Sequence, residues 1–164
     1  PRGASAATPI PILSTIEEST MRMHHVDRLL ASSSFRIFAR ILLTLVFWSS
    51  GLAKLFDFPT AIAEMEHYGL APAAPTAIAV IFVQLAGSAL VISGRHIWLG
   101  AGALGVFTVL TIPIAHAFWS MSGQAAFLEM LFAIEHLSVV GGLMIVAILG
   151  RRTAAVQAPV LAGA

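Results

Sequence analysis

The sequence predicts an all-α polytopic membrane protein, a bundle of four transmembrane helices. Three observations predict this class. Of the 164 residues, 58% are hydrophobic and only 10% are charged, whereas a soluble domain carries about 25% charged residues. The mean hydropathy is +0.90. The apolar residues also form four long runs, each close to the roughly 20 residues that a helix needs to cross the hydrocarbon core of a bilayer.

The four apolar runs cover residues 36–55, 73–93, 97–118 and 127–149. The first is too long for the apolar part of a secretory signal peptide, so we interpret it as a retained span. The second carries Gln84, and the third carries Pro113, which we expect to weaken the helix one turn before His116. The fourth carries Glu135 and His136. Because lipid offers the backbone no hydrogen bonds and runs this long lack the alternation of barrel strands, all four are expected to be helices.

The charged residues predict the orientation of the spans. With four spans, both chain ends and the connection between the second and third spans lie on one side. Of the nine basic residues, all except Lys54 fall on that side: Arg2, Arg22, Arg28, Arg36, Arg40, Arg95, Arg151 and Arg152. The positive-inside rule makes that side cytoplasmic, with both termini inside. We therefore expect a cytoplasmic extension over residues 1–34, the four-helix domain over 35–150 and a disordered cytoplasmic tail over 151–164.

The composition excludes several functional classes. The chain has no cysteine, which removes disulfide scaffolds, thiolate nucleophiles and iron–sulfur clusters, so a redox role would need a bound cofactor. The net charge of +1 leaves no basic block for a phosphate backbone, and nucleic acid is not an expected partner. Gly100, Gly102 and Gly105 spell GxGxxG, but they lie inside an apolar run without the preceding strand that a dinucleotide site requires.

Polar residues within the spans and at their outer ends are the candidates for a functional site, because an ionisable side chain at membrane depth is costly unless it faces the bundle interior and finds a partner. These candidates are Glu135, His136, His116, Lys54, Gln84, Asp57 and Glu129. Counted from the cytoplasmic helix ends, Lys54 and His116 lie at ~27 and ~28 Å, and Glu129 at ~30 Å. The adjacent Glu135 and His136 lie deeper, at ~20 Å. We expect the polar, small-residue faces of the helices to meet.

The adjacent Glu135 and His136 are the candidates most suited to proton exchange. Histidine changes its charge near neutral pH, so the pair suits proton exchange with a quinol or another reducible headgroup. The alternative is that the pair is structural, and that Lys54, Asp57 and Glu129 merely extend toward the outer headgroups. A bis-histidine haem is not expected, because His116 and His136 differ by ~9 Å in depth on a 1.5 Å rise. We predict no metal site.

Five short motifs follow one another along the spans: Phe47-x-x-Ser50-Gly51-x-x-Lys54-Leu55-x-Asp57, Tyr68-Gly69-Leu70-x-Pro72, Gly87, His116-x-Phe118-Trp119 and Gly141-Gly142-Leu143. In this order, over about residues 36–150, they resemble the DoxX family of small four-span bacterial membrane proteins. The resemblance implies a multi-pass protein of the bacterial inner membrane. The family is named for a subunit associated with an archaeal terminal quinol oxidase and is related to a thiosulfate:quinone oxidoreductase subunit.

The match to the family's polar positions is partial. Lys54, Asp57 and His116 match polar positions of the pattern. In contrast, many relatives have a glutamate where Gln84 stands, and often Lys-Asn where this chain has Glu135 and His136. The chain therefore lacks one intramembrane carboxylate of its relatives and carries another elsewhere.

These observations predict an accessory subunit of a quinone-linked or redox-stress membrane complex. Its intramembrane polar cluster would handle protons or bind a quinone headgroup while a partner oxidoreductase carries the electrons. The alternatives are a structural or assembly protein without a ligand and a small-solute transporter. A non-catalytic subunit fits better than a stand-alone enzyme. Besides the lipid bilayer, the partners to consider are a soluble or membrane oxidoreductase and further copies of the chain, while bound quinone is the one cofactor to consider.

Overall fold

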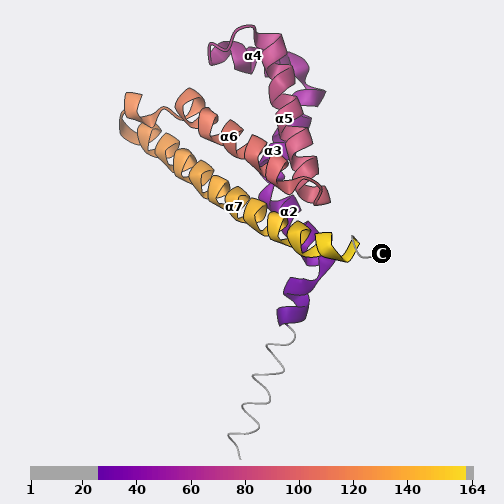
Figure 1. Cartoon of the computed structure of the whole chain (residues 1–164). Helices are drawn as coiled ribbons and strands as arrows, with labels where there is room; N and C mark the ends of the chain where they lie inside the picture. Colours follow the sequence, from indigo (N-terminus) through magenta and orange to yellow (C-terminus); the bar gives the residue numbers. More distant parts are fainter. Residues whose placement is uncertain (1–25, 162–164) are drawn as a thin grey trace, which may run out of the picture. The chain divides into compact units, whose positions relative to one another are not determined.

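The computed structural model describes the backbone of residues 26–161 and the side chains of residues 26–150. Most of the predicted N-terminal extension, and the side chains of the predicted tail, lie outside this described part. The chain divides into two compact units, residues 1–38 and 39–164. In the first unit, residues 26–31 are helical, and the Oγ of Ser32 caps helix α2 (Ser33–Leu43) by accepting a hydrogen bond from the Phe35 amide at 3.5 Å. The last residues of α2 and the other helices belong to the second unit (Figure 1).

The first predicted span is a broken helix, which the sequence reading did not expect. α2 ends at Leu43, α3 (Leu45–Phe56) follows, and their axes differ by 58°. At the break, the hydroxyl of the fully buried Thr44 donates a hydrogen bond to the Arg40 carbonyl at 2.8 Å, a contact that bends helices. The indole Nε1 of Trp48 donates to the Ile41 carbonyl at 3.3 Å, so side chains supply hydrogen bonds to carbonyls beside the break.

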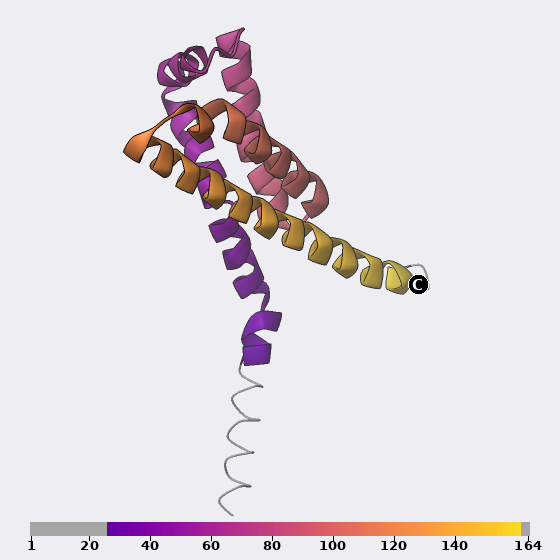
Figure 2. The same cartoon turned by 90° about the vertical axis from the view of Figure 1, so that its left-hand side faces the viewer.

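The connection after the first span is a helix, α4 (Phe58–His67). Asp57 caps its first turn, because its side-chain oxygen accepts a hydrogen bond from the Thr60 amide at 3.2 Å. Ala61 and Met65, one turn apart, are 1% and 3% exposed and pack against the buried Ala77 of the next helix. This short amphipathic helix therefore lies on the start of α5 (Ala73–Ser93), as Figures 1 and 2 show.

The second span matches its prediction, whereas the last two differ at their ends. α5 covers the expected residues and is capped by Gly94, whose φ of 80° suits glycine. α6 (Ile97–Ala115) ends before residue 118, because His116 leaves the helical conformation (φ −122°, ψ 45°) soon after Pro113. A 3-10 turn, η1 (Phe118–Ser120), leads to α7 (Gly123–Leu161). The expectation of a disordered tail is wrong up to Leu161, since the alanine-rich sequence continues the helix.

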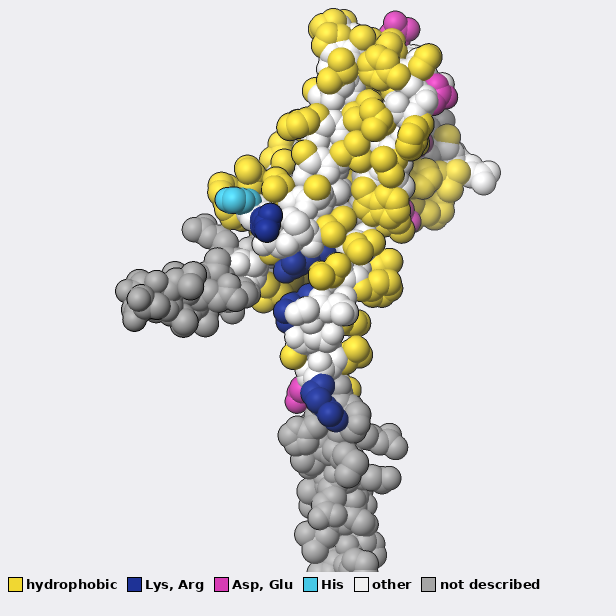
Figure 3. Space-filling model, turned by 90° about the vertical axis from the view of Figure 1, so that its right-hand side faces the viewer, with side chains coloured by type: hydrophobic (Ala, Val, Ile, Leu, Met, Phe, Trp, Pro, Cys, Tyr) yellow, Lys and Arg dark blue, Asp and Glu magenta, His cyan; other side chains and the backbone are white. Residues whose placement is uncertain are grey.

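The described helices fit a membrane protein by length and composition. α5, α6 with η1, and residues 123–150 of α7 are each long and apolar enough to span a bilayer, and the bent pair α2 and α3 makes a fourth span if it crosses as one. Large apolar side chains such as Phe82 and Ile145 face outward. On the face in Figure 3, hydrophobic side chains cover much of the upper part of the molecule, and few charged groups lie among them. The orientation of the termini stays a prediction.

Two apolar cores hold the second unit together. The larger joins α3, α5, α6 and α7 through its buried members Phe47, Val91, Ala101, Leu104 and Leu143. The smaller joins α4 to α5 through Ala61, Met65 and Ala77. Because the two cores share helix α5, this helix positions α4 relative to the other three.

Helices α5 and α6 cross at a pair of glycines. A Cβ added to Gly100 would lie 2.7 Å from the Gly87 carbonyl oxygen and 2.8 Å from the Leu90 Cβ. A Cβ on Gly87 would lie 2.8 Å from the Cγ of Leu104. Close approach through small residues is how membrane helices pack without a hydrophobic driving force. The glycines at 87 and 100 therefore set the separation of α5 and α6.

Candidate functional site: a polar cavity between the helices

A cavity of about 610 Å³ lies between the two apolar cores of the second unit. Helices α3 to α7 all contribute to its lining. Phe47, Phe107 and Val139 line it from the larger core, and Met65 and Val80 line it from the smaller one. The volume is within the range of about 300–1,000 Å³ that is usual for small-molecule sites.

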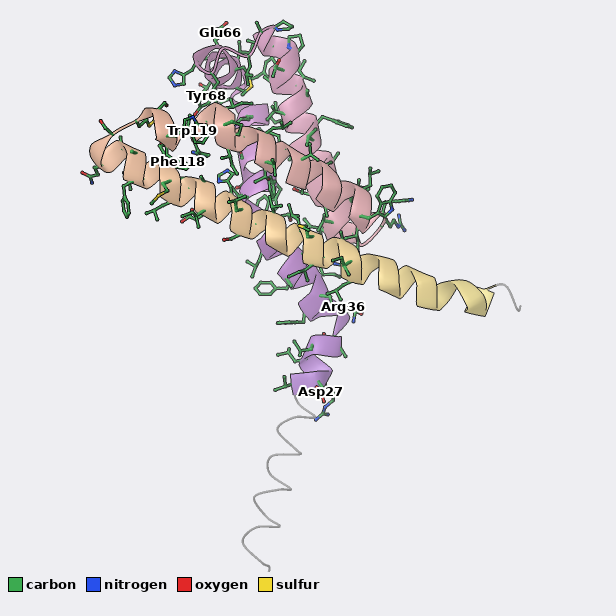
Figure 4. The ribbon with its side chains drawn as sticks, turned by 60° about the vertical axis from the view of Figure 1, so that its left-hand side comes forward. Asp27, Arg36, Glu66, Tyr68, Phe118 and Trp119 are labelled. Carbon is green, nitrogen blue, oxygen red and sulfur yellow. The ribbon has the colours of Figure 1, made fainter. Side chains whose placement is uncertain are left out.

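The polar residues of the lining come from two groups of helices. From α3, α4, α5 and the turn after α4 come Ser50, Lys54, Glu64, Tyr68, Thr76 and Gln84. From α6, its C-terminal end and α7 come Thr108, Thr111, His116, Glu135 and His136. We call these the α3–α5 side and the α6–α7 side of the cavity. Figure 4 shows Tyr68, Phe118 and Trp119 at the same end of the helical unit as α4.

Lys54 is the centre of the α3–α5 side. Its ammonium Nζ lies 2.8 Å from a carboxylate oxygen of Glu64 and donates a hydrogen bond to the Ser50 Oγ at 3.2 Å. The Nε2 of Gln84 also donates to the Ser50 Oγ, at 3.3 Å. The side chain of Lys54 is 15% exposed and that of Glu64 is 39% exposed. The ion pair therefore links α3 to α4, and the serine links α3 to α5.

Two buried polar atoms near this side lack a hydrogen-bond partner. Gln84 is 5% exposed and its Oε1 is unpaired, and Ser88 is 1% exposed with an unpaired Oγ. They are one helical turn apart on α5. Leaving such groups unpaired costs free energy, so both atoms have hydrogen-bonding capacity that the chain itself does not use.

On the α6–α7 side, the two histidines are in contact. The ring centroids of His116 and His136 lie 4.6 Å apart. The Nδ1 of His116 lies 2.7 Å from a carboxylate oxygen of Glu129, and the Nδ1 of His136 lies 2.7 Å from the Phe132 carbonyl oxygen. A carbonyl oxygen only accepts hydrogen bonds, and so does an ionised carboxylate. In both rings, Nδ1 is therefore the donor.

The structure places five of the seven predicted site residues in the cavity lining: Lys54, Gln84, His116, Glu135 and His136. Glu129 contacts the cavity only through His116, to which it is paired. Asp57 caps helix α4 instead and does not line the cavity. The functional roles of these residues stay predictions.

The predicted separation of His116 and His136 in depth is wrong, since their rings are in contact. The third span does not continue as a straight helix to residue 118. Because α6 ends at Ala115, His116 lies where the chain turns back toward α7, and its ring also lies 5.7 Å from that of Phe132. The premise against a bis-histidine haem therefore fails, although rings in direct contact leave no space for an iron between them.

Glu64 and Tyr68 belong to the lining but were not among the predicted site residues. The sequence reading treated their segment as a connection. A signal was present, since Asp57 caps the segment and Ala61 and Met65 have the one-turn spacing of a buried helix face. Once residues 58–67 are recognised as a helix, Glu64 falls beside Met65 at the edge of the buried face of that helix. In the structure its carboxylate is paired with Lys54 of α3.

Fold and site together define a multi-pass α-helical membrane protein in which polar side chains from five helices converge on one cavity. The chain belongs to the DoxX family, because the family model described as DoxX matches residues 35–117, about half of the chain. This match ends just after His116, so α7 with Glu135 and His136 lies outside it.

A curated relative supports this assignment. The inner membrane protein YphA of Escherichia coli (strain K12) is 25% identical to this chain over 114 residues, which cover 70% of this chain and 81% of YphA. No solved structure gives a significant match. The chain is a multi-pass protein of the bacterial inner membrane.

Proposed function

We propose that the chain is a non-catalytic accessory subunit of a quinone-linked membrane complex and that its cavity binds the quinone headgroup. One observation carries the proposal: the 610 Å³ cavity combines apolar walls with hydrogen-bonding groups on two sides. A quinone headgroup has the same combination, because it is a flat apolar ring with oxygens at opposite positions. Apolar sites with a few convergent polar groups are the usual form of ligand sites.

The lining also offers the long tail of a membrane quinone a way out to the lipid. Val46, Leu110 and Ile114 line the cavity, yet they are 52%, 57% and 41% exposed. In a bilayer, side chains exposed at these positions along the spans face the acyl chains. An isoprenoid tail that passes these residues stays in an apolar environment while the headgroup occupies the cavity.

In the proposed role, the chain binds the quinone headgroup and exchanges protons with it, while a partner oxidoreductase carries the electrons. The chain has no cysteine that could exchange electrons. Lys54, held by Ser50 and Glu64, supplies a hydrogen-bond donor for a ring oxygen. His116, Glu135 and His136 supply groups that can exchange protons. An oxidoreductase partner would complete the electron transfer.

A binding titration tests this function. The full chain is reconstituted in lipid nanodiscs and titrated with a short-tailed ubiquinone analogue. Gln84→Met keeps the side-chain length but removes the hydrogen bond to Ser50, so we expect Kd to rise about 2- to 10-fold. Gln124→Met, the same change at an exposed position outside the lining, is the control and should leave Kd unchanged. Absence of saturable binding to the wild-type chain would contradict the proposal.

One observation favours solute transport as a second candidate. Broken helices beside a midplane site are common in transporters, and the first span is bent by 58° at Thr44. This alternative predicts solute flux in proteoliposomes that is reduced by Glu135→Gln. If neither flux nor quinone binding occurs, and if Glu135→Gln and His136→Asn reduce only the yield, the chain acts as an assembly or structural protein.

A further inference from the structure

Hydrogen-bond donors and acceptors are unequally distributed over the two sides of the cavity. On the α6–α7 side, the Thr108 hydroxyl donates to the Leu104 carbonyl at 2.7 Å, and the Thr111 hydroxyl donates to the Phe107 carbonyl at 2.9 Å. Both hydroxyl protons are therefore used within α6. A hydroxyl oxygen whose proton is used in this way can only accept a further hydrogen bond.

The histidines of this side follow the same pattern. In each ring the Nδ1 proton is used, by Glu129 for His116 and by the Phe132 carbonyl for His136. A neutral imidazole carries one proton, so the Nε2 of each ring is an acceptor. Glu135 adds a carboxylate, which accepts when it is ionised. With neutral histidines, the five polar side chains of the α6–α7 side thus offer a ligand acceptors only.

The α3–α5 side differs because it holds a cation. Lys54 has three N–H donors, of which the Ser50 hydroxyl and the Glu64 carboxylate use two. Ser50 accepts hydrogen bonds from both Lys54 and Gln84, which leaves its own proton free for an acceptor. A ligand that spans the cavity therefore meets the donors of Lys54 and Ser50 on the α3–α5 side, beside the unpaired Oε1 of Gln84, and acceptors on the α6–α7 side.

We propose that the cavity selects the reduced, hydroxyl-bearing form of its ring ligand, a hydroquinone, over the oxidised quinone. The inference rests on the proposed function, since it presupposes that a quinone-type ring occupies the cavity. A hydroquinone hydroxyl donates to His116, His136 or Glu135, and its other oxygen accepts from Lys54 or Ser50. A quinone has two carbonyl oxygens and no donor, so one of them would face acceptors only, which is unfavourable in a low-dielectric site.

Calorimetric titration of the nanodisc-embedded chain tests the selectivity. A short-tailed ubiquinone analogue and its quinol, kept anaerobic, are titrated separately under the same conditions. We expect the quinol to bind about tenfold more tightly, because one hydrogen bond replaces one acceptor–acceptor contact. The ratio of the quinone Kd to the quinol Kd measures the selectivity. This comparison uses the wild-type chain and so does not depend on the folding of a variant.

Variants locate the selectivity in the histidines. His136→Phe keeps an aromatic ring beside His116 but removes one of the acceptors, so the ratio should decrease while the quinone Kd changes little. His67→Phe is the matched control, because His67 does not line the cavity and phenylalanine keeps an aromatic ring beside Tyr68, and it should keep the wild-type ratio. Equal binding of both forms by the wild-type chain, or tighter binding of the quinone, would overturn the selectivity. Absence of binding by both forms would instead contradict the proposed function.

Discussion

The crossing of α5 and α6 gives the sharpest prediction for stability. In Gly100→Ala, the new methyl group would lie 2.7 Å from a backbone oxygen of Gly87 and 2.8 Å from the Leu90 Cβ. Neither atom is the end of a flexible side chain, so the helices must move apart. Overpacking of this kind costs ~1–3 kcal/mol. The same movement would separate Gln84 from Thr108 and so widen the cavity.

Two neighbouring glycines provide matched controls for this prediction. An added Cβ at Gly102 or Gly105 meets nothing within 4 Å. Because alanine is a better helix former than glycine, Gly102→Ala and Gly105→Ala should raise the free energy of unfolding by up to about 1 kcal/mol. Unfolding in mixed micelles with increasing SDS, followed by tryptophan fluorescence, measures all three variants. The reasoning is refuted if Gly100→Ala is as stable as the wild-type chain, or if the controls are destabilised equally.

Two further predictions concern residues around the cavity. Asp57→Ala removes the cap of α4, so the free energy of unfolding should fall by about 1 kcal/mol while the Kd for quinone stays unchanged. A change in this Kd with unaltered stability would assign Asp57 to the site instead. For the ion pair between α3 and α4, a double-mutant cycle with Lys54→Met and Glu64→Gln should give a coupling free energy of only about 0.5–1 kcal/mol, because Glu64 is 39% exposed. Strictly additive effects in that cycle would show that the pair does not hold α4.

The sequence could predict those helices whose ends carry local signals. The sequence predicts a helix over residues 73–93, and α5 covers the same residues, because Pro72 precedes this mainly apolar run and Gly94 follows it. The break at Thr44 was not predictable in this way, since the first run contains neither proline nor glycine near that position. It depends on side-chain hydrogen bonds of Thr44 and Trp48 to backbone carbonyls, and these become visible only in three dimensions.

The sequence predicts which residues belong to the candidate site better than it predicts how these residues are arranged. The cost of burying ionisable groups was sufficient to select Lys54 and His116, which line the cavity. Depth along a straight helix could not place the two histidines in contact, because it ignores the turn after Ala115. Pairing between helices, such as that of Lys54 with Glu64, likewise depends on the crossing geometry and not on spacing along the sequence.

The most direct test of the central claim is to identify what the chain carries when it leaves the membrane. The protein is extracted into lipid nanodiscs without detergent, and native mass spectrometry is combined with solvent extraction of the same sample. The account predicts a co-purified quinone or quinol, which is depleted in the double variant Glu135→Gln and His136→Asn but retained in His67→Phe. Recovery of phospholipid alone from the wild-type chain, in a preparation whose parent membranes contain quinone, would contradict it.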